Sequence, residues 1–459
     1  MNHYNYLDFK YNALWYEEFE NEFLFKSKHA KLKTRKNALL ANEAFKFTTN
    51  SRASLDPRVF QSGHGPYLKD VDDNLFLDLG SGIFISNLGH SHPKVSHAIS
   101  TEANQLIASH DYMTPVKHAF NQKLISTCDN GLRNIHLYDS GGVAIDIAIK
   151  AARAITKKQE VISCFGDHHG KSLAGASLGK ISHIPEFYRL PNFHLVPRPN
   201  PYAPMWIDDS GDIDTDKYIE FYETYINEST TGQIAAFILE PVQGWGGSVP
   251  APLDFFKKLN KLCKKYNALL VIDEVLSGCG RTGKWLAMDH YGVTPDMLIL
   301  GKGIGNGFPM SVLSAKSKYA KEISRIGPST SFGGNPMACG SGLAVLEIFE
   351  QDKILEASET LGRFFASSFL ELKNKYSIIG NVRGLGCLLG LDFVHPVTKK
   401  PAPEIAIAFY KECLSRGLIA GIPVLNLTRI APPLILSKNA AEKVINIMDI
   451  ALEIISSKF

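Results

Sequence analysis

Two charged residues each end an apolar segment that has the length of a buried strand. Lys302 follows the run 298–300 and Gly301, and Asp273 follows the run 268–272. A lysine at the end of a buried strand is costly to desolvate unless its amine has a function, such as forming a Schiff base. An aldehyde cofactor with a basic ring nitrogen needs such a lysine, together with a carboxylate that keeps the ring protonated. Either residue alone is better explained by a buried ion pair; the two residues together, with the motifs described below, favour the cofactor.

A second candidate site is an anion-binding turn. Gly141 and Gly142 follow Ser140 at the start of a helical pattern whose apolar face includes Ile147 and Ala148. Glycines let the backbone amides approach an anion at a helix N-terminus, where the helix dipole also favours negative charge. A Ser-Gly-Gly sequence alone is weak evidence, because the start of any helix can have the same pattern.

These segments resemble the signature of the class III pyridoxal-phosphate aminotransferases. The signature blocks are residues 273–275, 278–283 and 301–303. Further blocks match in the family's order at residues 65–70, 88–93, 240–244, 332–336 and 429–434. The resemblance covers residues 58 to 459. It implies a fold type I aminotransferase that uses pyridoxal 5'-phosphate, an amino acid or amine as the amino donor and an oxo acid as the acceptor.

The resemblance implies roles for the residues around the cofactor ring. Lys302 would carry the cofactor as a Schiff base and act as general base, and Asp273 would pair with the ring nitrogen. His168 stands where relatives usually have Tyr or Phe, and it would stack on the ring opposite Val275. Glu240 belongs to a loop that lines the site in relatives, although a loop residue satisfied by the backbone explains it nearly as well.

The resemblance also implies that two subunits share each active site. The turn at residues 140–142 would bind the cofactor phosphate from its own subunit. The hydroxyl residue before the 332–336 block would reach the phosphate of the neighbouring subunit; here it is Ser331, preceded by Thr330. A site built in this way requires a homodimer.

The substrate-binding part of the pattern is altered. Arg429 would bind a substrate carboxylate as a planar fork, with a surface salt bridge as the alternative. In relatives that accept terminal amines, a glutamate holds this arginine when no α-carboxylate is present; here Trp245 occupies that position, and Leu276 replaces a frequent Gln beside the cofactor oxygen. A racemase or epimerase therefore stays open as the alternative to transamination, with a lyase or decarboxylase as a third possibility. A binding module without catalysis is disfavoured because Asp273 and Lys302 are both present.

The elements that must position these residues alternate along the middle of the chain. Residues 234–239 and 268–275 have the composition of buried strands, and residues 253–267 between them have a helical pattern with one apolar face. Strand, helix and strand at this spacing form a βαβ unit, and open sheets of this kind bind ligands at the carboxyl ends of their strands. We predict an α/β fold, a mainly parallel sheet with helices on both faces, plus a smaller α+β domain from the two chain ends.

The predicted domain boundaries follow changes in these patterns. Residues 1–57 form an extension that packs on the dimer, 58–90 the N-terminal part of the small domain, 91–340 the large cofactor-binding domain and 341–459 the C-terminal small domain. The extension has too many aromatic residues for a free tail. Glutamates between these aromatic residues make membrane contact the weaker interpretation.

Composition excludes several classes of function. The net charge of +3, from 49 basic and 46 acidic residues, gives no nucleic-acid footprint. No apolar run approaches the roughly 20 residues of a membrane span, and no signal peptide is visible. The seven cysteines are scattered without a C-x-x-C pair, which indicates reduced thiols in the cytoplasm and no metal site.

Overall fold

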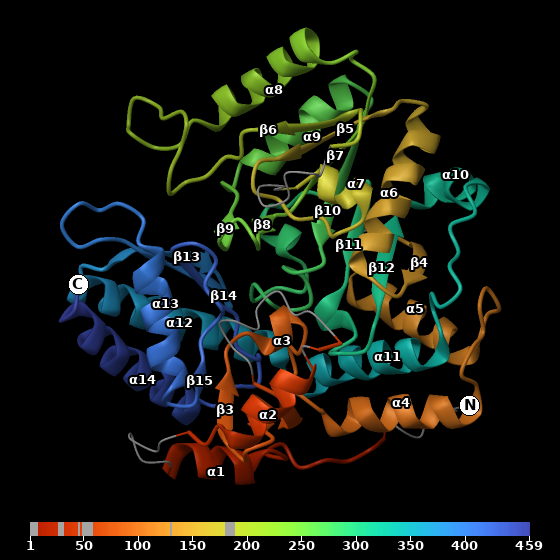
Figure 1. Cartoon of the computed structure of the whole chain (residues 1–459). Coiled ribbons are helices and arrows are strands. Elements are labelled where there is room, and N and C mark those ends of the chain that lie inside the picture. Colours follow the sequence, from red (N-terminus) through yellow and green to blue (C-terminus); the bar gives the residue numbers. More distant parts are fainter. Residues whose placement is uncertain (1–7, 26–31, 45, 48–57, 129–130, 180–188) are drawn as a thin grey trace.

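A seven-stranded sheet lies at the centre of the molecule (Figure 1). The computed structural model describes residues 8–25, 32–44, 46–47, 58–128, 131–179 and 189–459. The strand order is β4-β12-β11-β10-β7-β5-β6. Strand β12 runs antiparallel to both of its neighbours, and every pair from β11 to β6 is parallel. The strands are β4 (Asn134–Tyr138), β5 (Glu160–Cys164), β6 (Phe193–Val196), β7 (Ile234–Leu239), β10 (Leu269–Glu274), β11 (Met297–Leu300) and β12 (Ser311–Ala315).

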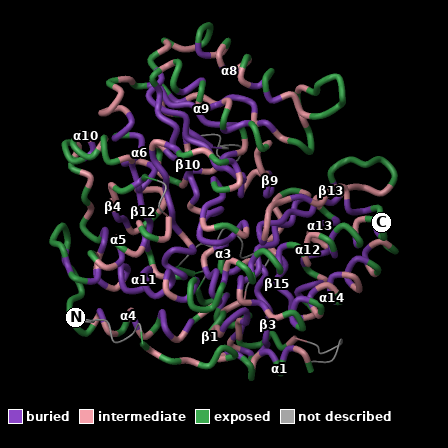
Figure 2. The backbone as a smooth tube through the Cα atoms, turned by 180° about the vertical axis from the view of Figure 1, so that it is seen from behind, coloured by how far each residue is buried: buried purple, intermediate pink, exposed green. Residues whose placement is uncertain are grey.

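Helices cover both faces of this sheet because its strands are apolar on both sides. Along β10, Val271 packs with one buried cluster, while Leu270 and Ile272 pack with the other. Figure 2 shows the central strands as buried throughout. The first face packs on α6 (Gly141–Thr156), α7 (Leu173–Ser177) and α10 (Ala320–Arg325). The second packs on α5 (Pro115–Thr127), α8 (Thr215–Ser229), α9 (Phe255–Lys265) and α11 (Pro336–Gln351).

The two ends of the chain form the second, smaller part of the fold. Strand β3 (Leu75–Asp78) pairs in parallel with β15 (Leu418–Ile419), which joins an N-terminal sheet to the C-terminal segment. The remaining strands of the two small sheets are β1 (Phe60–His64), β2 (Tyr67–Asp70), β13 (Ile379–Leu385), β14 (Leu388–Phe393) and β16 (Leu427–Ile430). Its helices are α3 (Ser81–Phe84), α12 (Ile354–Lys375), α13 (Pro403–Leu414) and α14 (Lys438–Ser456), while α4 (Pro93–Gln105) packs on α11. The predicted α/β class with a smaller α+β part is therefore confirmed.

The short elements of the loops are β8 (Val242–Gln243), β9 (Val249–Pro250), η1 (Ala287–His290), η2 (Lys302–Ile304) and η3 (Ser317–Tyr319). The predicted strand at 234–239 coincides with β7, and β10 occupies 269–274 of the predicted 268–275. The predicted helix at 253–267 is shorter, because α9 ends at Lys265 and Asn267 adopts a left-handed φ of 47°. The domain boundaries stay predictions; the one between residues 340 and 341 falls inside α11.

The described part of the N-terminal extension packs on its own chain. It contains α1 (Glu17–Phe25) and α2 (Arg35–Ala44), whereas residues 1–7, 26–31, 45 and 48–57 lie outside the described residues. The Tyr16 hydroxyl donates to the Ile435 carbonyl at 2.7 Å, and Ser437 Oγ donates to a Glu20 carboxylate oxygen at 2.7 Å. Tyr16 and Phe23 of this segment are part of the core, whereas Phe25 and Phe47 are exposed.

Two classes of feature are missing from the described ranges. No helix there combines the length and the hydropathy needed to cross a bilayer. Within the same ranges, no group of three or more His, Cys, Asp or Glu side chains is placed to hold a metal ion.

Candidate active site

A cavity of about 320 Å³ opens at the carboxyl ends of β10 and β11. This is the edge of the sheet at which parallel α/β folds bind ligands. The cavity brings together ten of the residues that the sequence analysis singled out. They are Ser140, Gly141, Gly142, His168, Glu240, Trp245, Asp273, Val275, Leu276 and Lys302.

Lys302 stands where β11 gives way to a tight turn. Its own φ is 47°, and the preceding Gly301 packs so closely that a Cβ there would lie 3.0 Å from Val275 Cγ1. Burial lowers the pKa of the Lys302 amine, while the carboxylates of Asp273 and Glu240 oppose this shift. A lowered pKa increases the fraction of neutral amine, which is the form that attacks an aldehyde.

Asp273 ends β10 with its carboxylate fixed from two sides. Oδ1 accepts a hydrogen bond from the Val275 amide at 2.9 Å, and Oδ2 lies 2.7 Å from Nδ1 of His169. The side chain is only 4% exposed, yet it lines the cavity. Its position suits a group that must present negative charge to a ligand in a fixed direction.

The turn at residues 140–142 forms the N-terminus of α6. The Ser140 carbonyl accepts from Ser311 Oγ at 2.8 Å, which ties the turn to β12. A Cβ added at Gly142 would meet no atom of the described residues within 4 Å, whereas one at Gly141 would lie 2.9 Å from Val275 Cγ2. Among the described residues, space is therefore open beside Gly142 at the N-terminus of α6, where a helix can bind an anion.

Glu240 and His168 line the cavity next to each other. Glu240 accepts from the His168 amide at 2.8 Å and from the Gly244 amide at 3.0 Å. Burial raises the pKa of Glu240 to about 8, and the nearby carboxylates of Asp167 and Asp273 add to the shift. Burial lowers the pKa of His168 to about 4, so its imidazole is neutral at physiological pH.

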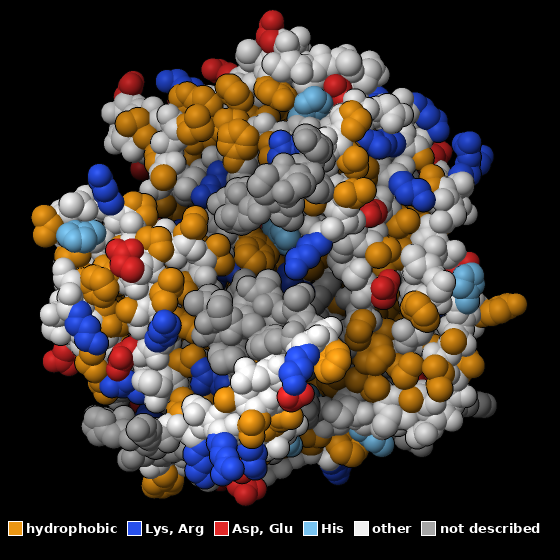
Figure 3. Space-filling view, viewed as in Figure 1, with side chains coloured by type: hydrophobic (Ala, Val, Ile, Leu, Met, Phe, Trp, Pro, Cys, Tyr) orange, Lys and Arg blue, Asp and Glu red, His pale blue; other side chains and the backbone are white. Residues whose placement is uncertain are grey.

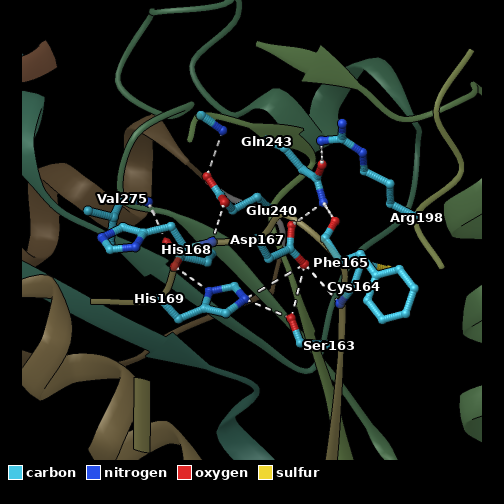
Figure 4. Close-up of polar contacts among 12 residues, drawn as sticks. Ser163, Cys164, Phe165, Asp167, His168, His169, Arg198, Glu240, Gln243 and Val275 are labelled. Atoms are coloured by element: carbon cyan, nitrogen blue, oxygen red, sulfur yellow. Dashed lines mark hydrogen bonds and ion pairs between the residues drawn. The ribbon is translucent and has the colours of Figure 1, made fainter. Parts of the chain in front are cut away.

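A buried network behind Asp273 was missed by the sequence analysis (Figure 4). His169 Nε2 lies 3.0 Å from Ser163 Oγ, and Ser163 Oγ donates to Asp167 Oδ2 at 3.0 Å. Gln243 Nε2 donates to Asp167 Oδ1 at 2.7 Å. Although burial lowers the pKa of His169, the hydrogen bonds and charges of Asp167 and Asp273 prevail and raise it to about 10. The available signal was the run of three polar residues at 167–169, which begins two residues beyond the buried strand β5.

Arg429 lies in β16, outside the lining of the cavity but in contact with it through Trp245. Its guanidinium carbon is 4.5 Å from the centroid of the Trp245 ring and 4.9 Å from that of Phe84. Nη1 also donates to the Gly244 carbonyl at 3.4 Å. With 4% of the residue exposed, Arg429 is buried and does not lie at the surface.

Thr330 and Ser331 are not part of the cavity lining within this chain. Thr330 Oγ1 accepts from the Gly333 amide at 3.1 Å, and Ser331 is exposed. The neighbouring Phe332 is 69% exposed. The assignment of these hydroxyl groups to a partner subunit's site stays a prediction.

The comparisons with known proteins agree with this geometry. The model of the family "Aminotransferase class-III" matches residues 49–452, and the chain belongs to that family. An acetylornithine aminotransferase of Methanocaldococcus jannaschii is 34% identical over 406 residues, which cover 86% of this chain and 93% of the relative. An alanine/serine racemase of Pyrococcus horikoshii is 32% identical over 434 residues, which cover 91% and 90% of the two chains. The structure of an amine transaminase from an uncultivated Pseudomonas species, in its PLP-bound form, matches with a TM-score of 0.81 and 26% identity and covers 88% of this chain and 97% of that one.

The enzyme is a pyridoxal-phosphate-dependent aminotransferase, and the cavity fits that cofactor. A lysine with a lowered pKa suits the aldehyde, and a fixed carboxylate suits the ring nitrogen. The open N-terminus of α6 suits the phosphate. These three features surround one cavity.

Proposed function

We propose that the enzyme transfers the amino group of an α-amino acid to a 2-oxo acid, with Lys302 as the residue that binds the cofactor covalently. The observation that supports this most is that Lys302 and Asp273 line one cavity, while Trp245, which also lines it, packs on Arg429. The first pair suits the cofactor, and Arg429 suits the carboxylate that α-amino acids and 2-oxo acids share.

Each residue has a defined task in this mechanism. When bound, pyridoxal phosphate supplies the aldehyde and an electron-accepting ring. Lys302 Nζ takes the proton from the substrate α-carbon and returns a proton in the second half of the reaction. Asp273 keeps a proton at the ring nitrogen, and Arg429 orients the substrate through its carboxylate. His168 and Trp245, with ring centroids 5.3 Å apart, exclude water from one side of the cavity.

Trp245 narrows the proposed substrate class. Its ring packs on the Arg429 guanidinium, so an apolar wall stands beside the carboxylate-binding group. Relatives are named as acetylornithine, ornithine and 5-aminovalerate aminotransferases, which indicates the range of amino donors in the family. We expect donors with an α-carboxylate to react faster than donors with only a terminal amine.

A racemase or epimerase is the second candidate function. It is supported by two relatives, the alanine/serine racemase and an isoleucine 2-epimerase of Lentilactobacillus buchneri, which is 29% identical over 425 residues. A racemase needs no acceptor, so chiral analysis of each amino acid recovered from acceptor-free reactions separates the two functions. Transamination releases at most one oxo product per active site without an acceptor and continues only when an acceptor is added; repeated inversion without one would replace the first candidate.

Reduction with borohydride tests the covalent assignment. We expect a pyridoxyl adduct on Lys302 and none in Lys302→Ala, which should also lose turnover. Lys316→Ala is the matched control, because Lys316 pairs with Asp296 at the opposite end of the sheet. An adduct mapped to another lysine would remove Lys302 from this role.

The proposal includes a homodimer with shared sites and a cytoplasmic location. The dimer is supported by the exposed hydroxyl of Ser331, which has no place in its own cavity. Exposed apolar side chains include Leu106, Ile107, Tyr112 and Met113. Figure 3 shows hydrophobic side chains gathered over α5 and α11.

The cytoplasmic location is supported by the seven cysteines, which are all free thiols.

A further inference from the structure

A chain of hydrogen bonds connects Asp273 in the cavity with Arg198 in the loop after β6. Its inner part determines where the protons of His169 lie. Ser163 Oγ has a single proton and donates it to Asp167, so His169 Nε2, 3.0 Å away, must donate to Ser163. The other ring nitrogen faces the Asp273 carboxylate at 2.7 Å and must donate there as well. His169 is therefore held as an imidazolium between two carboxylates.

The outer part of the chain fixes Asp167. Gln243 Nε2 donates to Asp167 Oδ1 at 2.7 Å and to the Phe165 carbonyl at 3.0 Å, so both amide protons are used. The amide oxygen of Gln243 then accepts from Nη1 of Arg198, which also donates to the Gly246 carbonyl at 3.0 Å. Because a guanidinium can only donate hydrogen bonds, Arg198 orients the side-chain amide of Gln243 with its oxygen toward Arg198 and its NH2 group toward Asp167.

The surrounding backbone leaves room for this guanidinium. A Cβ at Gly166, where φ is +88°, would lie 2.9 Å from Arg198 Nη1, and a Cβ at Gly246 would collide with the same atom. The loops that contain Gly166 and Gly246 thus approach Arg198 closely because both residues are glycines. Positive and negative groups also alternate along the chain, from Arg198 through Asp167 and His169 to Asp273.

We propose that Arg198 is a positioning residue for Asp273: through Gln243, Asp167 and Ser163 it keeps His169 doubly protonated and aimed at the Asp273 carboxylate. The proposal rests on the proposed function, in which Asp273 serves the cofactor ring. Arg198 itself does not line the cavity, so it acts only through the residues between.

The imidazole of His169 provides a direct readout. The titratable groups that face it are Asp273 at the end of β10, Asp167 and His168 after β5, with Glu240 and Lys302 across the cavity. In full-length, cofactor-loaded protein labelled with ¹⁵N-histidine, its signal is assigned by its loss in His169→Gln. We expect His169 to stay protonated to about pH 10 in the wild type.

The decisive variants remove the hydrogen bonds of Arg198 and Gln243, which lie farthest from Asp273. Arg198→Met should lower the pKa of His169 by about one unit or more, because Asp167 is no longer held. It should also shift the pH dependence of the cofactor's absorbance and reduce kcat about 10-fold with a smaller change in KM. Arg198→Lys should restore most of each property, and Gln243→Leu should reproduce the loss if Arg198→Met does not fold. Arg153→Met is the matched control, because Arg153 packs on the ring of Phe193 and takes no part in the series of hydrogen bonds from Arg198 to Asp273.

The outcomes separate this inference from the proposed function. If the wild type forms the adduct on Lys302 but neither Arg198→Met nor Gln243→Leu moves the His169 signal, Arg198 has no positioning role. A fall in stability with an unchanged imidazole pKa would have the same meaning. If the wild type forms no adduct on Lys302, the proposed function fails whatever the imidazole does.

Discussion

The guanidinium of Arg429 packs against two aromatic side chains at the edge of the active site. Trp245 and Phe84 lie on its guanidinium with centroid distances of 4.5 and 4.9 Å. Such contacts hold a guanidinium in one plane, which is the orientation that the proposed carboxylate contact requires. The resemblance implies that some relatives have a glutamate at the position of Trp245. In this enzyme the neighbour of Arg429 at that position is therefore an apolar ring, which cannot form an ion pair with the guanidinium.

Removal of this ring should weaken recognition of the carboxylate. We expect Trp245→Leu to reduce kcat/KM for 2-oxo acids about 2- to 30-fold, since a cation–π contact contributes roughly 0.5–2 kcal/mol. Single-turnover half-reactions with matched amino acids and simple amines measure the effect. Trp206→Leu, in a cluster with Tyr218 and Phe221, is the control. Equal losses for acids and amines would show that Trp245 does not act through Arg429.

At the scale of elements, the N-terminus of α6 allows a paired test. Alanine at Gly142 would project into open space, whereas alanine at Gly141 would meet Val275. We expect Gly142→Ala to lower cofactor affinity with little change in the melting temperature of the cofactor-free protein. Gly141→Ala should cost about 1–3 kcal/mol of unfolding free energy through overpacking.

Calorimetry of the cofactor-free proteins and equilibrium titration with pyridoxal phosphate measure the two effects. If Gly142→Ala binds the cofactor as tightly as the wild type does, the phosphate does not lie at this helix.

A second prediction at this scale concerns the N-terminal segment. Tyr11 and Trp15 pack on the His92 ring with centroid distances of 4.7 and 5.4 Å, and burial lowers the pKa of His92 to about 3. A histidine whose pKa is lower in the folded state stabilises the protein above pH 6.5, and this contribution is lost as the pH falls toward 3. At pH 5 the loss is about 2 kcal/mol.

Urea unfolding at pH 8 and pH 5 measures this loss. His92→Gln should reduce the difference between the two pH values, while His110→Gln, at an exposed position, should leave it unchanged. An unaltered pH dependence in His92→Gln would show that another group is responsible.

The sequence predicted the elements whose signals are local. Strand β7 coincides with its apolar run, and Lys302 and Asp273 were found because each ends such a run. The network behind Asp273 could not be predicted, because its members come from separate segments that meet only in the folded sheet. The pattern around residue 340 likewise gave no sign that α11 continues through it, since a helix that is apolar on nearly every side has no periodic boundary.

At the scale of the whole molecule, the proposed homodimer with shared sites leads to a complementation prediction. Ser331→Asp should weaken cofactor binding in a chain whose own cavity does not contain Ser331, because like charge repels the phosphate. Subunits with Ser331→Asp and subunits with Lys302→Ala should each be inactive alone. A mixed dimer would contain one site in which Lys302 from one subunit and Ser331 from the other are both unchanged. Activity should therefore return after the two variants are unfolded and refolded together. Absence of recovery, with mixed dimers verified by mass spectrometry, would show that the sites are not shared.

The parallel pair of β3 and β15 has a consequence for biosynthesis. Strand β15 begins 340 residues after β3 ends, at residue 418 against residue 78. The central sheet lies between them in the sequence and can therefore assemble during translation, while the edge of β3 stays without its partner until β15 has been made. An uncovered edge is a template for pairing with other chains. Nascent chains of this enzyme should thus bind chaperones until β15 emerges, and chains terminated before residue 418 should aggregate.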